Sequence, residues 1–224
     1  FSNGHVADFE NLAVEGDAVL DAPGASETPT YVFHGAVHGD GNVTMAGSGP
    51  KININGNGSD GTFTGHLEVN AGKVHVYGPN ALGTPSIDLE VNGHRDLFLY
   101  AEQLPMDIHS VTGGLHGLAA GSLKGNVTVS GGEMEFVSGA VMDANFLYEG
   151  SAYGGISEPN TFTGTTSVTV DGLGLNWKGA QEHSGGTTFR NGASAELNWE
   201  TGDPNTYGNP LGTGTLTLDN SDII

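Results

Sequence analysis

Two histidines have the best metal-ligand spacing in the chain. His34 and His38 lie four residues apart, and Asp40 follows them. Imidazole and carboxylate groups are common metal ligands. In an extended strand, residues i and i+4 point to one face, but their side chains begin about 13 Å apart. The pair can therefore share an ion only if Gly35 bends the chain, and outward positions on strands are the simpler interpretation of the histidines.

Oxygen-rich turns make calcium the better candidate metal. Short Asp/Asn/Gly turns occur at residues 40–42, 57–61 and 203–205, and calcium is bound by carboxylate and carbonyl oxygens. No segment matches an EF-hand loop or a tandem calcium-binding nonapeptide array. The same residue types also form ordinary turns, so both interpretations stay open. The calcium interpretation places ions at Asp40, Asn42, Asp60 and Asp203, and the sequence suggests no other cofactor.

Catalytic groups are sparse. The candidate cluster is formed by four residues that are near one another in sequence: Asp88, His94, Arg95 and Asp96. Strand alternation sends neighbouring side chains to opposite faces, so no two-carboxylate arrangement of the glycosidase kind emerges. With no cysteine in the chain, thiol catalysis and thiolate metal sites are excluded. We therefore predict no catalytic residues, and a polysaccharide lyase or hydrolase is the alternative.

The charge balance excludes several partners. Lys and Arg number 6 against 26 Asp and Glu, for a formal net charge of −20. Nucleic-acid binding needs basic side chains that replace phosphate counterions, and anionic membranes and polyanionic sugars are disfavoured for the same reason. No stretch of about 18 apolar residues suggests a membrane span, and no signal peptide is recognisable. Because the chain starts at Phe1, we expect processed ends or a piece of a longer, exported protein.

Short alternating segments must position these groups. Residues 62–64, 67–69 and 74–77 each alternate apolar and polar side chains and are closed by Gly or Asn, as β-strands are. They are too short for independent hairpins, and no two-residue Asn-Gly or Asp-Gly turn joins them. No apolar stripe of helical period occurs. The pattern predicts an all-β coil in which each strand pairs with its counterpart one turn away.

Phrases of the sequence recur. NTFTG at 160–164 repeats GTFTG at 61–65, and residues 183–189 are a looser version. NPLGTGTLTL at 209–218 likewise repeats NALGTPSIDL at 80–89. Self-similarity on this scale is typical of solenoids, in which successive coils bury a continuous core.

These phrases resemble the autotransporter-associated β-strand repeat, which is found in passenger regions of bacterial autotransporters and other large secreted surface proteins. Residues 31–89 and 160–218 follow the repeat best, and 121–137 keeps a fragment of it. The resemblance implies a right-handed parallel β-helix and an extracellular or cell-surface location. It implies no particular activity.

We therefore predict one domain over residues 1–224, a single right-handed parallel β-helix of roughly nine to eleven coils. Residues 1–30 would form a terminal coil and loop, 31–89 and 160–218 the regular repeats, and 90–159 irregular coils. The apolar run at 97–100 is interpreted as a buried strand, with an insertion that contacts a neighbour as the alternative.

Apolar residues near both termini suggest assembly. Phe1 and Phe9 lie at one end, and Ile223 and Ile224 at the other. Open solenoid ends present unpaired backbone groups, so we expect further sequence or a second copy to cover them. The sequence thus favours a non-enzymatic structural or adhesive protein, either a rod of a surface passenger region or a subunit of an extracellular fibre. Its expected partners are copies of itself, further domains of the same polypeptide, or surface glycans and matrix.

Overall fold

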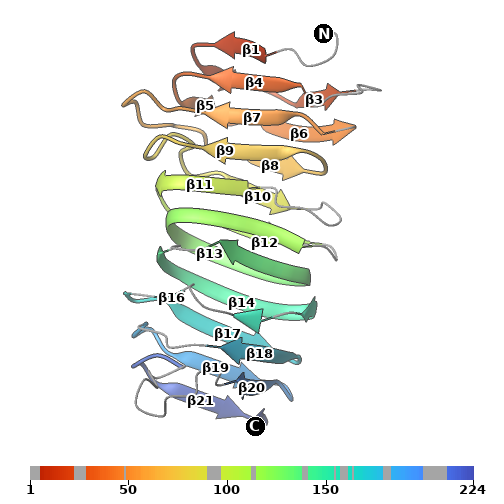
Figure 1. The fold of residues 1–224 in the computed structure, drawn as a ribbon, viewed down its shortest axis with the longest axis vertical. Coiled ribbons are helices and arrows are strands. Elements are labelled where there is room, and N and C mark those ends of the chain that lie inside the picture. Colours follow the sequence, from red (N-terminus) through yellow and green to blue (C-terminus); the bar gives the residue numbers. More distant parts are fainter. Residues whose placement is uncertain are drawn as a thin grey trace.

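The computed structural model describes residues 6–22, 29–47, 49–89, 97–111, 115–137, 141–153, 155–156, 161–162, 164–178, 183–198 and 211–224. In these residues every regular element is a β-strand, and every strand pairing among them is parallel. The chain winds into an elongated solenoid (Figure 1). The predicted all-β parallel architecture without hairpins is confirmed. The described part contains no helix with the length and apolar character needed to cross a bilayer.

One side of the solenoid carries a column of six strands, which we call column A. Its members in order are β1 (Val6–Phe9), β4 (Thr30–Phe33), β7 (Lys51–Ile54), β9 (Lys73–Val76), β11 (Leu97–Glu102) and β13 (Leu115–Val137). Counted along this column, about six turns stack, not the nine to eleven coils that we predicted. The column ends because β13 is 23 residues long and bends round the solenoid into the next side (Figure 1).

The neighbouring side carries the longer column B. It begins with β3 (Ala18–Ala22), β6 (Asn42–Gly47), β8 (His66–Val69), β10 (Ser86–Leu89) and β12 (Met106–Ser110), passes through β13, and continues through β14 (Val141–Tyr153), β17 (Ser167–Asp171), β19 (Thr187–Arg190) and β21 (Leu216–Asp219). The shared strand β13 joins the two columns into one sheet. Column B is the surface on which the candidate site lies.

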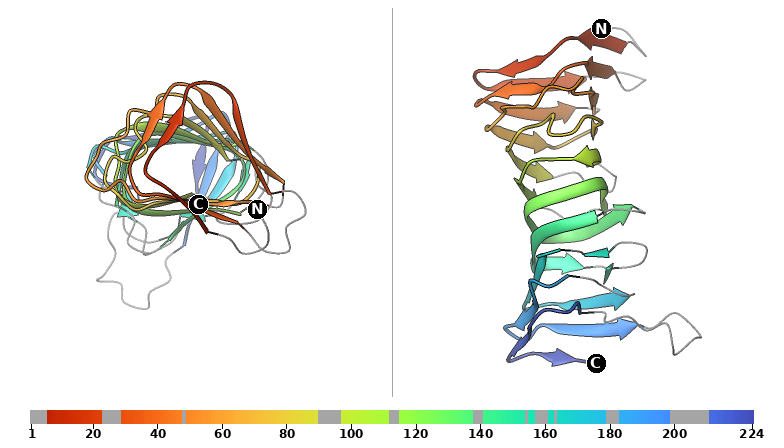
Figure 2. Two further views of the ribbon diagram at one scale, coloured as in Figure 1. Left: turned by 90° about the horizontal axis from the view of Figure 1, so that it is seen from above. Right: turned by 90° about the vertical axis from the view of Figure 1, so that its left-hand side faces the viewer.

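Smaller groups of strands complete the coils. A four-stranded sheet consists of β15 (Gly155–Ile156), β18 (Gly174–Lys178), β20 (Ser194–Asn198) and β22 (Asp222–Ile223). A pair consists of β2 (Leu12–Val14) and β5 (Val37–Gly39), and β16 (Thr161–Phe162) pairs with β14. Viewed from above, the strands surround one interior (Figure 2).

Strand alternation fills that interior. In β6, β8, β10 and β17, apolar side chains are buried at every second position and polar ones lie between them. Side chains in register stack on similar ones in the next coil: Met45 lies beside Val69, and Val69 beside Leu89. All three are at most 1% exposed. Stacking therefore produces one continuous core, as a solenoid requires.

One predicted strand is not a regular strand. Residues 62–64 belong to no assigned element, although Thr62 and Thr64 donate backbone hydrogen bonds to Val37 and Gly39 at 2.9 Å. Phe63 is 1% exposed, so its inward position was anticipated by the alternation. Turns on either side of residues 62–64 limit the number of backbone hydrogen bonds that this segment makes with the neighbouring coil.

The apolar run at residues 97–100 is a strand, as predicted. Leu97 and Leu99 of β11 are fully buried, whereas Tyr100 is 47% exposed. Strand alternation explains the division, because Tyr100 points outward beside Tyr77 of the previous coil with their rings stacked at 4.7 Å.

Candidate functional site

Polar side chains follow one another along the outer face of column B. Asn42 Nδ2 donates to Asp17 Oδ1 at 2.7 Å, and Asn126 Nδ2 donates to Asp107 Oδ1 at the same distance. In the next coils Asn145 Nδ2 donates to Asn126 Oδ1 at 3.1 Å, and Ser167 Oγ donates to Asn145 Oδ1 at 2.9 Å. We call the whole set the polar ladder: Asp17, Asn42, His66, Ser86, Asp107, Asn126, Asn145 and Ser167.

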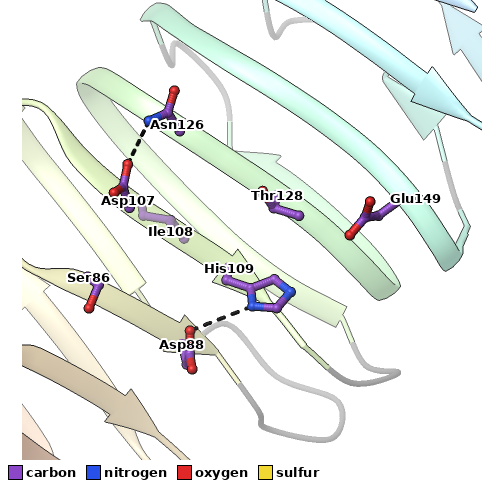
Figure 3. Close-up of a pocket in the computed structure, with 8 residues that line it drawn as sticks. All are labelled: Ser86, Asp88, Asp107, Ile108, His109, Asn126, Thr128 and Glu149. Atoms are coloured by element: carbon purple, nitrogen blue, oxygen red, sulfur yellow. Dashed lines mark hydrogen bonds and ion pairs between the residues drawn. The ribbon is translucent and has the colours of Figure 1, made fainter.

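A groove of about 330 Å³ lies over the middle of this face. Its lining comes from β10, β12, β13 and β14 and consists of Ser86, Asp88, Asp107, Ile108, His109, Asn126, Thr128 and Glu149. Figure 3 shows the Asp107–Asn126 pair and the Asp88–His109 pair separated by Ile108, with Glu149 beyond Thr128. Residues about one coil apart in the sequence are thus brought together by the register of the strands.

At the β10 edge of the groove a carboxylate lies between two imidazoles. Asp88 Oδ2 lies 3.5 Å from His66 Nε2, and Asp88 Oδ1 lies 3.7 Å from His109 Nδ1. The Asp88 side chain is 32% exposed and the His109 side chain 41%, so water and solutes reach both. When the imidazoles are protonated, they neutralise part of the negative charge on this face.

His109 also connects to the far side of the groove. Its Nε2 atom lies 2.8 Å from Ser130 Oγ, and that hydroxyl donates to Glu149 Oε1 at 3.1 Å. Asp88, His109 and Ser130 stand in the order of a hydrolytic triad. However, the 3.7 Å separation of Asp88 and His109 exceeds hydrogen-bond length, and the Ser130 proton is directed to Glu149. These hydrogen bonds link polar side chains of three successive strands, β12, β13 and β14.

A hydrogen-bonded carboxylate lies further along the same face. Glu68 Oε2 accepts from Thr44 Oγ1 at 2.9 Å. Hydrogen bonds from Asn70 and Thr44 hold the pKa of Glu68 below its ordinary value, since they stabilise the charged form. At neutral pH Glu68 is therefore ionised and adds to the negative charge on column B.

An aromatic cluster occupies the outer face of column A. His75 is stacked on Phe98 with ring centroids 4.4 Å apart, and its Nδ1 lies 3.4 Å from the Tyr77 hydroxyl and 3.3 Å from that of Tyr100. His75 is 9% exposed and its Nε2 has no hydrogen-bond partner. Burial, with the charges of Lys51 and Lys73, lowers the pKa of His75 to about 4. The stacked rings cover one another's faces, so the cluster serves packing.

The predicted calcium ligands have separate partners. The Asp40 backbone N–H donates to Val14 O at 3.1 Å, and the Asn42 side chain is engaged with Asp17. Asp60 Oδ1 accepts from Asn80 Nδ2 at 3.3 Å. Across the described ranges, no three His, Asp or Glu side chains form a group that could hold a metal ion. Asp203 lies outside the described residues, and calcium binding stays a prediction.

The two spaced histidines do not converge. His34 Nε2 lies 3.3 Å from Asp8 Oδ1, whereas His38 Nδ1 lies 3.0 Å from Thr62 Oγ1. Each therefore contacts a different neighbouring coil. The cluster containing His94, Arg95 and Asp96 is outside the described residues.

The predicted assembly residues lie on exposed end strands, as far as the structure describes them. Phe9 is 43% exposed and stacks on Phe33 at 5.3 Å. Ile224 is 82% exposed, although its N–H donates to Ala195 O at 3.0 Å, and Ile223 is half-buried. Phe1 lies outside the described residues.

Sequence reasoning missed the groove because it compared near neighbours. Asp88 and His109 are far apart in the sequence, yet they are in direct register between β10 and β12. The signal was the coil repeat itself: outward polar residues about 20 positions apart meet on one face. Applied to the outward positions, that repeat would also have paired Asp107 with Asn126.

No protein-family model, curated protein or solved structure matches the chain.

Proposed function

We propose that the chain is a non-enzymatic structural or adhesive protein, a β-solenoid rod of an extracellular surface. The observation that carries the proposal is the architecture: parallel strands stack in long columns around one continuous core. The resemblance of residues 31–89 and 160–218 to the autotransporter-associated repeat supports an exported passenger-type rod. The acidic composition, at −20, supports solubility outside the cell and disfavours polyanionic partners.

Head-to-tail contact with another coil is part of the proposal. Phe9 is in register with Phe33, and Leu218 with Phe189. Phe33 and Phe189 are at most 5% exposed, whereas Phe9 and Leu218 are 43% and 49% exposed. Both ends of the described solenoid therefore present core-facing apolar side chains. In the purified protein we propose that a second copy covers them, a heterologous contact that propagates into a fibre.

The test is the size of the particle as concentration rises. Light scattering and electron microscopy of the wild-type chain should show growth along one axis. Leu218→Asp places a charge on the core-facing position and should abolish growth. Thr217→Asp, on the opposite face of the same strand, adds the same charge and should leave growth intact.

A monodisperse wild-type monomer at high concentration, with rapid amide exchange in both β1 and β21, would contradict the head-to-tail contact. Equal effects of the two substitutions would show that added charge, not loss of the core-facing side chain, blocks growth.

A carbohydrate-active role is the second candidate, and the groove favours it. Asp88, Asp107 and Glu149 line one open surface with His109, and glycoside cleavage uses paired carboxylates. Incubation with a panel of neutral polysaccharides tests it. Released product that disappears in both Asp88→Asn and Glu149→Gln would replace the structural proposal, whereas binding without product agrees with adhesion to surface glycans.

A further inference from the structure

A tight turn centred on Asn57 and Gly58 projects from the solenoid. The Ser59 N–H donates to Gly56 O at 2.7 Å and closes the turn. Asn57 has a φ of 30° and Gly58 a φ of 76°. Positive φ at both central residues is the type I′ pattern, for which Asn-Gly is the favoured pair. Both residues are exposed.

Asn-Gly is also a reactive pair. The Gly58 backbone nitrogen can attack Cγ of the Asn57 side chain, because glycine has no Cβ to obstruct the approach. An N–Cγ bond forms and the Cγ–Nδ2 bond breaks. The proton of the Gly58 amide passes through solvent to Nδ2, which leaves as ammonia. Water then opens the cyclic imide at either carbonyl to give aspartate or isoaspartate. The reaction needs no reactant besides water.

The surroundings leave this pair free to react. Among the described residues, neither the Asn57 carboxamide nor the Gly58 N–H has a hydrogen-bond partner. A Cβ placed on Gly58 would meet no atom within 4 Å, so the turn has room to rearrange.

The chain contains the same turn elsewhere with its reactive groups bound. Asn191 and Gly192 have φ values of 58° and 80°, and the Ala193 N–H donates to Arg190 O at 3.1 Å. Here the Gly192 N–H donates to Asn220 O of the next coil at 2.8 Å. The Asn191 side chain donates to Asp171 Oδ1 of the previous coil at 2.7 Å.

Among the described residues the remaining Asn-Gly pair is Asn55-Gly56, and its nucleophilic N–H is hydrogen-bonded; Asn3-Gly4 and Asn92-Gly93 lie outside the described residues. The Gly56 N–H donates to Gly35 O at 3.1 Å, and Asn55 Nδ2 lies 3.4 Å from His34 Nδ1. To react, either bound pair must first break its contacts with neighbouring coils, which slows any chemistry that requires local opening.

We propose that Asn57 is a site of spontaneous deamidation in the folded protein, whereas stacking of the coils protects Asn55 and Asn191. The product carries one more negative charge than the −20 of the sequence. The new carboxylate lies in the turn that directly precedes Asp60, whose Oδ1 already accepts from Asn80. The fraction of molecules deamidated at this exposed turn should therefore increase with the age of the protein.

Peptide mapping by mass spectrometry tests the proposal. The full chain is incubated at mildly alkaline pH and 37 °C, once folded and once in concentrated urea, and conversion at the three sites is followed over time. In the folded protein Asn57 should react about tenfold faster than Asn55 and Asn191, since each protected site must lose backbone and side-chain hydrogen bonds first. In urea the three rates should converge.

Equal rates at Asn57 and Asn191 in the folded protein would overturn the proposal. So would a ratio that is the same in urea, because the flanking sequence and not the fold would then set it. Asn57→Gln removes the reactive pair without adding charge, and Asn3-Gly4 and Asn92-Gly93 are common to both proteins. On ion-exchange, the aged folded variant should therefore gain less negative charge than the aged wild-type protein. An equal gain of charge in the two proteins would also overturn the assignment.

Discussion

Replacing His75 with phenylalanine should flatten the pH dependence of stability between pH 6.5 and 4. The wild-type imidazole is 9% exposed and packs between Phe98 and the hydroxyls of Tyr77 and Tyr100. Phenylalanine preserves the stack on Phe98 and removes the ionisable group. The two tyrosines are 42% and 47% exposed, so water can replace their contacts with the imidazole.

The direction follows from proton linkage. The pKa of His75 falls from the ordinary 6.5 to about 4 in the folded protein, chiefly through burial. Above pH 6.5 the imidazole is neutral in both the folded and the unfolded state, so His75 does not lower the free energy of unfolding. As the pH falls below 6.5, His75 is protonated in the unfolded chain but stays neutral in the folded chain. The free energy of unfolding therefore declines until the pH reaches about 4.

The magnitude follows from the same shift. Each unit of pKa difference is worth about 1.4 kcal/mol, which sets an upper value of about 3 kcal/mol for the whole interval. Lys51 and Lys73 contribute part of the shift, and salt screens those charges. We therefore expect wild-type His75 to cost about 2 kcal/mol at pH 4 relative to pH 7.

Urea unfolding at a series of pH values measures the effect. The difference between wild type and His75→Phe should change by about 2 kcal/mol across the interval, which cancels the titration of the many carboxylates common to both proteins. Tyr77→Phe removes one hydroxyl contact but keeps His75. The free energy of unfolding of this variant should therefore depend on pH in the same way as that of the wild type. Parallel curves for wild type and His75→Phe would refute the reasoning that burial keeps this histidine neutral.

Three further substitutions or conditions test the core, the turns and the charge. Phe146→Ala should cost about 3–5 kcal/mol in urea unfolding, because Phe146 is 2% exposed and packs on Phe162 at 4.7 Å; Leu147→Ala on the outer face should cost about 1 kcal/mol, and equal losses would contradict the assigned faces. Gly125→Ala should cost more than about 2 kcal/mol, because Gly125 has a φ of 106° and a Cβ there would collide with the backbone oxygen of Met106; Gly16→Ala, which meets nothing within 4 Å, should be nearly neutral by the same measurement. Added salt should raise the Tm because it screens a net charge of −20, and a further rise with calcium at matched ionic strength, reversed by chelator, would support bound calcium; an unchanged Tm from low to high salt would refute the charge argument.

The parallel solenoid could be predicted from the sequence because its physical cause is local. Alternation in segments such as residues 67–69 and 74–77 identifies which side chains point inward, and β8 and β9 indeed bury Leu67, Val69, Val74 and Val76. The division of the run at 97–100 into buried and exposed positions follows from the same rule.

The site could not be predicted in the same way. Asp88, His109 and Ser130 come together only through the register between coils, and coil length varies along the chain. The step from Ser86 to Asp107 differs from the step between Thr187 and Leu216. Without the register, the outward polar residues have no fixed neighbours, so short-range spacing pointed to His34 and His38 instead.

The direction of the strand hydrogen bonds has a mechanical consequence. In columns A and B the bonds between coils run along the long axis of the solenoid, and the strands lie across it (Figure 1). Tension applied along that axis therefore acts on one coil boundary at a time and can peel coils off in sequence. A force applied across the axis must instead shear a whole row of bonds together. A rod of this design yields gradually when pulled from its ends and resists being torn sideways.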